Sequence, residues 1–368
     1  MVTFRPAGPG GLAGADTFER GIGGAETNVL CGLAAAGHRV KWVSRVGADG
    51  FGTHLLDRVA AHGVDTTDVA RDPARPTGIY FRTAGERAVT DAPCAPAEAP
   101  LSEVAYYRAG SAASAMSPAT VPLAAARSGR LLHLTGITAA LSQDCLALLR
   151  ALLAPAPATG TGTDTGTGSD TAPDAGSAAH RPLVSFDLNY RVSLWPGPAA
   201  AAPVLFGLAR AADTVFVGDD EAAALGVTGG PAAVRAALPE PPLLVVKQGA
   251  AGATAFHRGP GGTDTVTAVP APRVDVVAPV GAGDAFAAGF LSATLRGLPL
   301  RLRLRHGHLA AAAALTVPGD LPEPPVRARS EEADRLAALD DAAWGRLRIG
   351  PGGARPPRPG AQEEVATP

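Results

Sequence analysis

The sequence predicts an α/β protein built on a mainly parallel sheet that helices cover on both faces. Its 368 residues are 46% hydrophobic and 18% charged, which is enough for a large core. Apolar runs typical of strands alternate along the chain with alanine-rich stretches typical of helices. The runs are nearly continuous in apolar residues, as expected for strands buried on both faces.

The elements follow in order. Residues 24–37 (GAETNVLCGLAAAG) predict a helix that ends at Gly37, residues 39–46 (RVKWVSRV) a strand, and the stretch after Gly52 a second helix. We expect later strands at 131–135, 183–187, 214–217 and 243–247, and helices at 141–153, 199–212, 219–226, 231–238 and 282–296. Residues 75–111 contain short β-like pieces (TGIYFRTA, EVAYYRAG), which predict a small antiparallel flap on the main body.

Two segments lack the composition of a folded core. Residues 154–181 consist almost entirely of glycine, threonine, alanine and proline, and residues 350–368 are similar. Such segments bury too little apolar surface to offset the entropy of ordering the chain. We therefore expect a single domain over residues 1–349, interrupted by a disordered insertion at 154–181 and followed by a disordered tail at 350–368.

Charge and composition exclude several classes of protein. The formal net charge is −2, from 32 basic and 34 acidic residues, so no overall attraction to nucleic acid or to a membrane surface is expected. No run of 18 apolar residues is present, and the start of the sequence does not resemble a signal peptide. The three cysteines, Cys31, Cys94 and Cys145, are sparse and far apart, as is typical of a reducing cytoplasm.

The first motif that indicates chemistry is PVGAGDAFAAGFLSATL, residues 279–295. A strand-like VDVV precedes it and an alanine-rich helix follows, so Gly281, Ala282 and Gly283 should lie at a helix N-terminus with Asp284 in its first turn. Backbone N–H groups at that end bind anions, and an acid beside them can take a proton from an attacking hydroxyl. The alternative is a glycine-rich turn with a capping aspartate, which the spacing alone favours. The GxxxxGK[ST] and GxGxxG patterns are absent.

The second motif is GIGGAETNVLCGLAAAG, residues 21–37. Gly24 opens the helix and lets a small ligand approach the backbone, while Asn28 offers a donor and an acceptor one turn later. A glycine turn with a capping asparagine explains this pattern equally well.

Read together, GGAETN and GAGDAFAAGF resemble the paired signatures of the PfkB family of carbohydrate kinases, over about residues 1–320 without the insertion. The resemblance implies a ribokinase-like three-layer α/β/α sandwich whose β-lid comes from about residues 1–20 and 75–112. It implies transfer of the γ-phosphoryl group of ATP, with Mg²⁺, to a sugar hydroxyl. Asp284 would then be the general base, and Gly281, Ala282 and Gly283 the anion hole.

Further segments point to an acidic sugar. In YYRAGSAAS (106–114) Tyr106 and Arg108 share one face of a strand, and FDLNYRVSLW (186–195) ends a strand. Two arginines that converge on one pocket indicate an anionic ligand, although each could instead form a surface ion pair. With GGAETN, these segments resemble the family members that phosphorylate 2-keto-3-deoxygluconate (2-dehydro-3-deoxygluconate). The resemblance implies that the sugar acid contacts Gly24, Asn28, Tyr80, Tyr106, Arg108 and Arg191. A neutral-sugar kinase of fructokinase or ribokinase type and a catalytically silent sugar sensor are the alternatives.

The nucleotide side is also implied by resemblance. VVKQGAAGATAF (245–256) and VGDDEAAALG (217–226) match family segments near ATP. The residues assigned to the nucleotide are Asn189, Lys247, Gly249, Gly252 and Glu221. Mg²⁺ is expected to bind through ATP oxygens and water, with Glu221 acting through water and no direct protein ligand. Glu221 could instead be an exposed acid at a helix start.

The chain departs from the family pattern in four places. Gly218 replaces a common asparagine, Ala278 replaces the usual aspartate of the second signature, and His308 lies near a position where other members carry an asparagine. The family also begins with a buried strand ahead of the segment that matches MVTFRPAGPGG, so about one core strand is expected to be missing. By analogy with the family, a homo-oligomer formed through the lid is expected.

Overall fold

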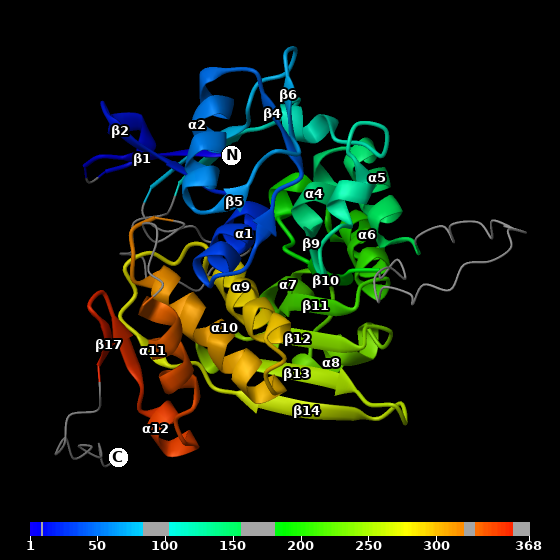
Figure 1. Ribbon diagram of the computed structural model, residues 1–368, viewed down its shortest axis with the longest axis vertical. Coiled ribbons are helices and arrows are strands. Elements are labelled where there is room, and N and C mark those ends of the chain that lie inside the picture. Colours follow the sequence, from blue (N-terminus) through cyan, green and yellow to red (C-terminus); the bar gives the residue numbers. More distant parts are fainter. Residues whose placement is uncertain (9, 84–102, 156–180, 320–327, 356–368) are drawn as a thin grey trace, which may run out of the picture.

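The computed structural model describes residues 1–8, 10–83, 103–155, 181–319 and 328–355. Its centre is a six-stranded sheet in the order β14-β13-β12-β11-β10-β9 (Figure 1). The strands are β9 (Leu131–Thr135), β10 (Leu183–Asp187), β11 (Thr214–Gly218), β12 (Leu243–Lys247), β13 (Ala253–Arg258) and β14 (Asp264–Val269). β9 to β12 are parallel, which confirms the predicted sheet, and β13 and β14 continue it as antiparallel strands.

Both faces of this sheet are buried, and alternate residues of one strand belong to different cores. Val215 and Val217 of β11 pack with α5 (Gln143–Leu153), α6 (Pro198–Arg210) and α8 (Pro231–Ala237). Phe216 between them packs with α9 (Ala282–Leu295) and α10 (Leu300–Leu315) on the other face. Because every position meets a core, the strand sequences are apolar without alternation. The result is the predicted three-layer α/β/α sandwich.

Helix α1 (Ala25–Ala35) crosses α9 at close range. A Cβ atom added to Gly32 of α1 would lie 2.7 Å from the Cβ atom of Ala288 in α9. The missing side chain therefore allows the two backbones to approach closely. This contact brings the N-terminal motif beside the C-terminal one.

The predicted lid segments form one four-stranded sheet in the order β2-β1-β7-β8. β1 (Val2–Pro6) pairs antiparallel with β2 (Phe18–Ile22) and parallel with β7 (Ile79–Arg82), which pairs antiparallel with β8 (Val104–Tyr107). Residues 84–102, between β7 and β8, lie outside the described part of the chain.

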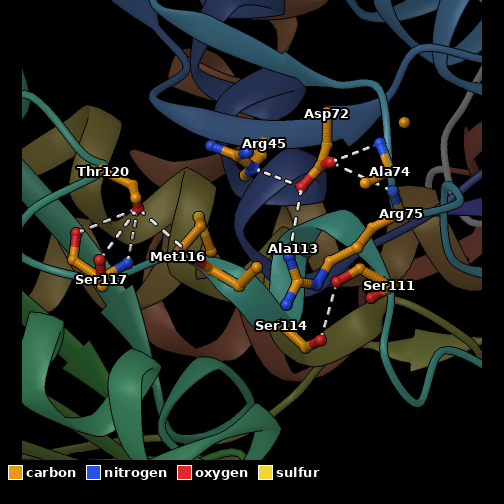
Figure 2. A network of polar contacts seen from close by, with 12 residues as sticks. Arg45, Asp72, Ala74, Arg75, Ser111, Ala113, Ser114, Met116, Ser117 and Thr120 are labelled. Carbon is orange, nitrogen blue, oxygen red and sulfur yellow. Dashed lines mark hydrogen bonds and ion pairs between the residues drawn. The ribbon is translucent and has the colours of Figure 1, made fainter.

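A buried aspartate fixes the turn that leads into β7. Asp72 accepts hydrogen bonds from Nε of Arg45 at 2.8 Å and from the backbone N–H groups of Ala74 and Arg75 at 2.9 and 3.1 Å. Figure 2 shows this carboxylate between the side chain of Arg45 and the turn that contains Ala74 and Arg75. The backbone N–H of Ala112, just after Ser111, then donates to the carbonyl oxygen of Pro76 at 2.9 Å. These hydrogen bonds thus connect the segment that leads into β7 with the segment that follows β8.

Two small parallel pairs stand apart from the main sheet: β3 (Val40–Lys41) with β5 (Val64–Asp65), and β4 (Ser44–Gly47) with β6 (Val69–Asp72). Residues 40–46 line one wall of a cavity, and residues 131–134 of β9 line another. Side chains of consecutive residues in an extended segment point to opposite faces. A cavity on one face would contact only every second residue. This cavity contacts every residue of both segments, so it lies along the edges of their backbones. We call this space the strand slot. Within the described residues, β9 pairs with β10 alone, so its slot-facing edge has no partner strand.

The structure corrects three sequence expectations. The strand expected at 39–46 is split between β3 and β4 because its halves pair with different strands. Of the strand-like VDVV, only Val274 lies in a strand, while Val276 and Val277 are exposed. The tail expected from residue 350 still contains β17 (Gly353–Arg355), paired with β16 (Arg348–Gly350), which in turn pairs with β15 (Arg273–Val274).

The expected insertion also begins and ends in described residues. Arg181 forms an ion pair with Asp213, with 3.0 Å between Nη1 and Oδ1, while residues 156–180 and 356–368 lie outside the described part of the chain. The remaining helices are α2 (Gly50–Ala61), α3 (Leu123–Ala126), α4 (Gly136–Leu141), α7 (Asp219–Ala224), α11 (Ala328–Ala337) and α12 (Asp341–Gly345). Among the residues described, no helix is long and apolar enough to cross a membrane.

Candidate active site

The two motifs at opposite ends of the chain meet at Asp284. Nδ2 of Asn28, on α1, donates to Oδ2 of Asp284, in the first turn of α9, at 2.9 Å. Nδ2 of Asn189, just after β10, lies 3.4 Å from Oδ1 of the same carboxylate. The aspartate is therefore held between two side-chain amides that come from different elements.

Burial changes the chemistry of this carboxylate. Loss of solvent around Asp284 raises its pKa to about 7, helped by the nearby charge of Asp187 and opposed by the hydrogen bond from Asn28. A carboxylate with a pKa near neutrality accepts a proton more readily than an ordinary aspartate. The position is thus suited to a general base, not only to capping the helix.

Each of the two amides also has an oxygen without a partner. Oδ1 of Asn28 and Oδ1 of Asn189 are buried and accept no hydrogen bond within the described residues. Buried acceptors of this kind are costly unless a donor arrives. Both stand beside Asp284, so a polyhydroxylated ligand could supply the missing donors there.

An anion cradle lies next to Asp284. Gly281 adopts a left-handed conformation with φ +69°, and α9 begins at Ala282, so the first N–H groups of the helix have no partner within it. A Cβ atom on Gly283 would lie 3.5 Å from Nζ of Lys247. The helix end and an ammonium group therefore face the same space, which favours a phosphate.

Lys247 belongs to a buried charge cluster at the carboxyl ends of β10 to β12. Its Nζ donates to Oδ2 of Asp187 at 2.7 Å. Burial opposes its charge, but the carboxylates of Asp187 and Glu221 raise its pKa, so it stays protonated. Glu221 accepts from the backbone N–H of Gly218 at 3.2 Å, and burial raises its pKa to about 6. Glu221 is therefore not the exposed acid of the alternative interpretation.

Sequence reasoning assigned no role to Asp187, although its position in DLNYR was a usable signal. The residue ends a parallel strand, and such strand ends meet at one edge of the sheet. Asn189, two residues further on, also lines the cavity. Its assignment to the nucleotide stays a prediction; in the structure its side chain reaches Asp284, since the backbone turns with φ +43° two residues after the strand.

The predicted sugar side is an aromatic and basic wall. The rings of Tyr80 and Tyr106, on neighbouring strands of the lid, have centroids 5.3 Å apart. The guanidinium group of Arg108 lies over the Tyr106 ring, 4.2 Å from its centroid. Arg191 follows β10, and its charge acts on both Asp284 and Glu221.

One cavity of about 1760 Å³ joins these groups. Its lining includes the predicted residues Gly24, Asn28, Tyr80, Tyr106, Arg108, Asn189, Arg191, Glu221, Lys247, Gly249, Gly252, Gly281, Ala282, Gly283 and Asp284. The strand slot opens into the same cavity, which explains why its volume exceeds that of an ordinary ligand pocket.

Comparison with known proteins identifies the class. The family model for the pfkB family of carbohydrate kinases matches residues 4–165 and 161–326, and the chain therefore belongs to this family. It is a sugar kinase, a phosphotransferase with an alcohol group as acceptor.

Individual relatives give a finer picture. The 2-dehydro-3-deoxygluconokinase of Bacillus subtilis is 32% identical over 89% of this chain and 90% of its own. Fructokinase-2 of Zea mays is 28% identical over 90% and 91%. Among solved structures, a PfkB protein from Polaromonas sp. JS666 superposes with a TM-score of 0.69 at 34% identity, covering 90% of this chain and 96% of that one.

Proposed function

We propose that the protein transfers the γ-phosphoryl group of ATP to the 6-hydroxyl of 2-dehydro-3-deoxygluconate, giving the 6-phosphate and ADP. The observation that carries the proposal is the position of Asp284. Its half-buried carboxylate stands between Asn28 and Asn189 at the mouth of the anion cradle, with a pKa of about 7. The similarity to the B. subtilis enzyme supports the choice of sugar.

In the proposed step, the sugar oxygen attacks the γ-phosphorus while its proton passes to Asp284. The bond between the γ-phosphorus and the bridging oxygen breaks, and ADP leaves with that electron pair. The N–H groups of the cradle and the ammonium group of Lys247 stabilise the charge on the phosphoryl oxygens as it moves. Asn28 and Asn189 hold the carboxylate in place through their Nδ2 groups. Their Oδ1 atoms, which have no partner among the described residues, accept hydrogen bonds from sugar hydroxyls.

The carboxylate of the sugar acid would bind the basic wall. Arg108 and Arg191 line the cavity, and a guanidinium fork matches a carboxylate. Tyr80 and Tyr106 supply an apolar platform for the carbon chain and hydroxyls that can bind its oxygens.

Mg²⁺ would reach the site with ATP. Hard oxygen ligands suit this ion, and Glu221 lines the phosphate end of the cavity together with Lys247. Asp187 lies behind them and accepts from the ammonium group of Lys247. When bound, the ion neutralises phosphate charge. Glu221 would act on it through water, while Lys247 compensates the same phosphates directly.

The second candidate is a neutral-sugar kinase of the same family, which the match to the maize fructokinase supports. A coupled ADP-release assay separates the two. We expect turnover with 2-dehydro-3-deoxygluconate to exceed that with fructose and ribose. Arg108→Ala should lower kcat/KM for the acid about 10- to 100-fold, the usual value of hydrogen bonds to a charged group, and leave fructose nearly unchanged.

Arg58→Ala on the exposed face of α2 serves as the control, because that arginine is outside the cavity. Faster turnover of fructose than of the acid, or equal losses on both sugars in Arg108→Ala, would reject the acidic substrate. If the protein forms no ADP from ATP with any sugar, and sugars only raise its melting temperature, the protein is a sugar sensor.

A further inference from the structure

The cavity continues past the anion cradle, on the side away from Asn28. Beyond Lys247 it passes Gly249 and Gly252, on the short helix η4 (Gly249–Ala251) and its end, and reaches α10. Gly252 packs against the carbonyl of Val269 so closely that a Cβ atom would lie 2.3 Å from that oxygen. Nε2 of His308, on α10, lies 3.1 Å from the same oxygen.

Small and apolar side chains dominate the lining of this end of the cavity. His308, Ala311, Ala312 and Leu315 line it from α10, at the spacing of one helix face. Ala271 and Pro272 line it from the segment after β14. The walls are small and apolar, and the imidazole of His308 is the titratable group that α10 presents to this end of the cavity.

The hydrogen-bonding role of His308 is set by its partner. A carbonyl oxygen can only accept, so Nε2 carries the hydrogen and donates to Val269. In the neutral ring Nδ1 is then an acceptor. Burial lowers the pKa of His308 to about 4, so the ring remains neutral at physiological pH. Edge-to-face packing on Phe286, with centroids 5.2 Å apart, holds the ring in this orientation.

Nδ1 itself has a free lone pair. Within the described residues it makes no hydrogen bond, and it is not among the buried polar atoms without a partner. The residue lines the cavity although only 5% of its surface is exposed. The acceptor therefore faces the cavity.

We propose that Nδ1 of His308 accepts a hydrogen bond from the 6-amino group of a purine, and that this selects adenine nucleotides over 6-oxo purine nucleotides. The proposal rests on the proposed function, which places the nucleotide phosphates at the cradle. With the sugar on the Asn28 side, the nucleoside extends toward α10. A 6-oxo purine would set its own acceptor against the lone pair, and such mismatches discriminate strongly between ligands.

The test compares binding of ADP and IDP, which differ at the 6-position of the base, by calorimetry with Mg²⁺ present. We expect the wild type to bind ADP about tenfold more tightly than IDP. This ratio is within the range expected when one neutral hydrogen bond is lost. His308→Gln can keep the donor to Val269 but loses the acceptor at the Nδ1 position, so its ADP and IDP affinities should become equal. His308→Asn can place its amide oxygen where Nδ1 was, and should keep the preference.

Equal binding of ADP and IDP by the wild type overturns the proposal without any variant. It is also overturned if His308→Gln keeps the preference, or if His308→Asn loses it while melting at the wild-type temperature. The readout does not need a sugar. If the protein prefers ADP but phosphorylates no sugar, only the proposed function is rejected. If the protein is an active sugar kinase without a preference between the bases, only this inference is rejected.

Discussion

At the scale of single residues, Asp284 combines features that rarely occur together in a carboxylate kept for stability. It is half-buried, its pKa is raised to about 7, and its partners are neutral amides instead of cations. The nearest ammonium group, on Lys247, is paired with Asp187. The environment therefore keeps Asp284 able to take up a proton, at a cost in folding free energy.

We predict that Asp284→Asn lowers kcat by about 10²- to 10⁴-fold, the usual contribution of a general base, while sugar binding persists. The amide can still accept from Asn28, so the local geometry should remain. Turnover by the ADP-release assay and sugar affinity by calorimetry check the two halves. Near-normal turnover would contradict the assigned role.

The same variant has a signature in stability. The ordinary pKa of the side chain is 3.8, and the fold raises it to about 7. The unfolded chain thus releases this proton at lower pH, and the wild type loses stability as pH rises from about 4 to 7. Asp284→Asn removes that loss. Its melting temperature should exceed that of the wild type at pH 7 to 8, and the gap should close toward pH 4.

At the scale of elements, the crossing of α1 and α9 controls the site. The contact of Gly32 with Ala288 sets how closely the helices approach, and Asn28 lies one turn before Gly32 on α1. A wider crossing would lengthen the 2.9 Å hydrogen bond between Asn28 and Asp284. A glycine that contacts no ligand therefore supports catalytic geometry.

In Gly32→Ala, overpacking should lower the free energy of unfolding by about 1–3 kcal/mol. The higher helix propensity of alanine should offset up to about 1 kcal/mol of this loss. It should also reduce kcat, because Asn28 is displaced. The matched control is Gly207→Ala in α6, where an added Cβ atom meets nothing within 4 Å and only the helix-propensity gain applies. Urea denaturation of both proteins measures the difference. Equal stability would show that the crossing is not tightly packed.

At the scale of the whole molecule, the strand slot separates the main sheet from β3 to β6. In the part of the chain that the structure describes, the edge of β9 that faces the slot pairs with no strand, and Leu148, Leu149 and Leu152 of α5 line the same cavity. Such an edge is normally paired or covered in a parallel sheet. A strand parallel to β9 would end beside Thr135, which donates to Glu26 at the start of α1. Met1 lies near that end, since its nitrogen donates to the carbonyl oxygen of Gly23 at 2.7 Å.

This geometry predicts the effect of an added strand. A protein extended ahead of Met1 by about six β-branched apolar residues, a typical strand length, should melt several degrees higher than one extended by glycine and serine. Hydrogen exchange of the β9 amides should slow in the apolar extension only, because their edge becomes paired. Unchanged exchange at β9 would mean that the slot does not accept a strand.

Part of this architecture could be predicted from the sequence alone. The parallel strands β9 to β12 and the helices around them follow from apolar runs and alanine-rich periodicity, which reflect local burial. Glycines before Asp284 and before Asn28 marked the two helix starts that meet at the site. These features depend on residues close together in the chain, where pattern and backbone preference act directly.

What the tertiary structure decided concerns residues that are far apart in the chain. The amide of Asn189 turned to Asp284, Lys247 paired with Asp187, and His308 reached the carbonyl of Val269. Of VDVV, only Val274 lies in a strand, where it pairs with Ile349 near the other end of the described chain. The free energies of such contacts depend on which elements pack together and how closely. No local sequence pattern encodes that packing. It depends on the two cores that share the central sheet and on the contact between α1 and α9.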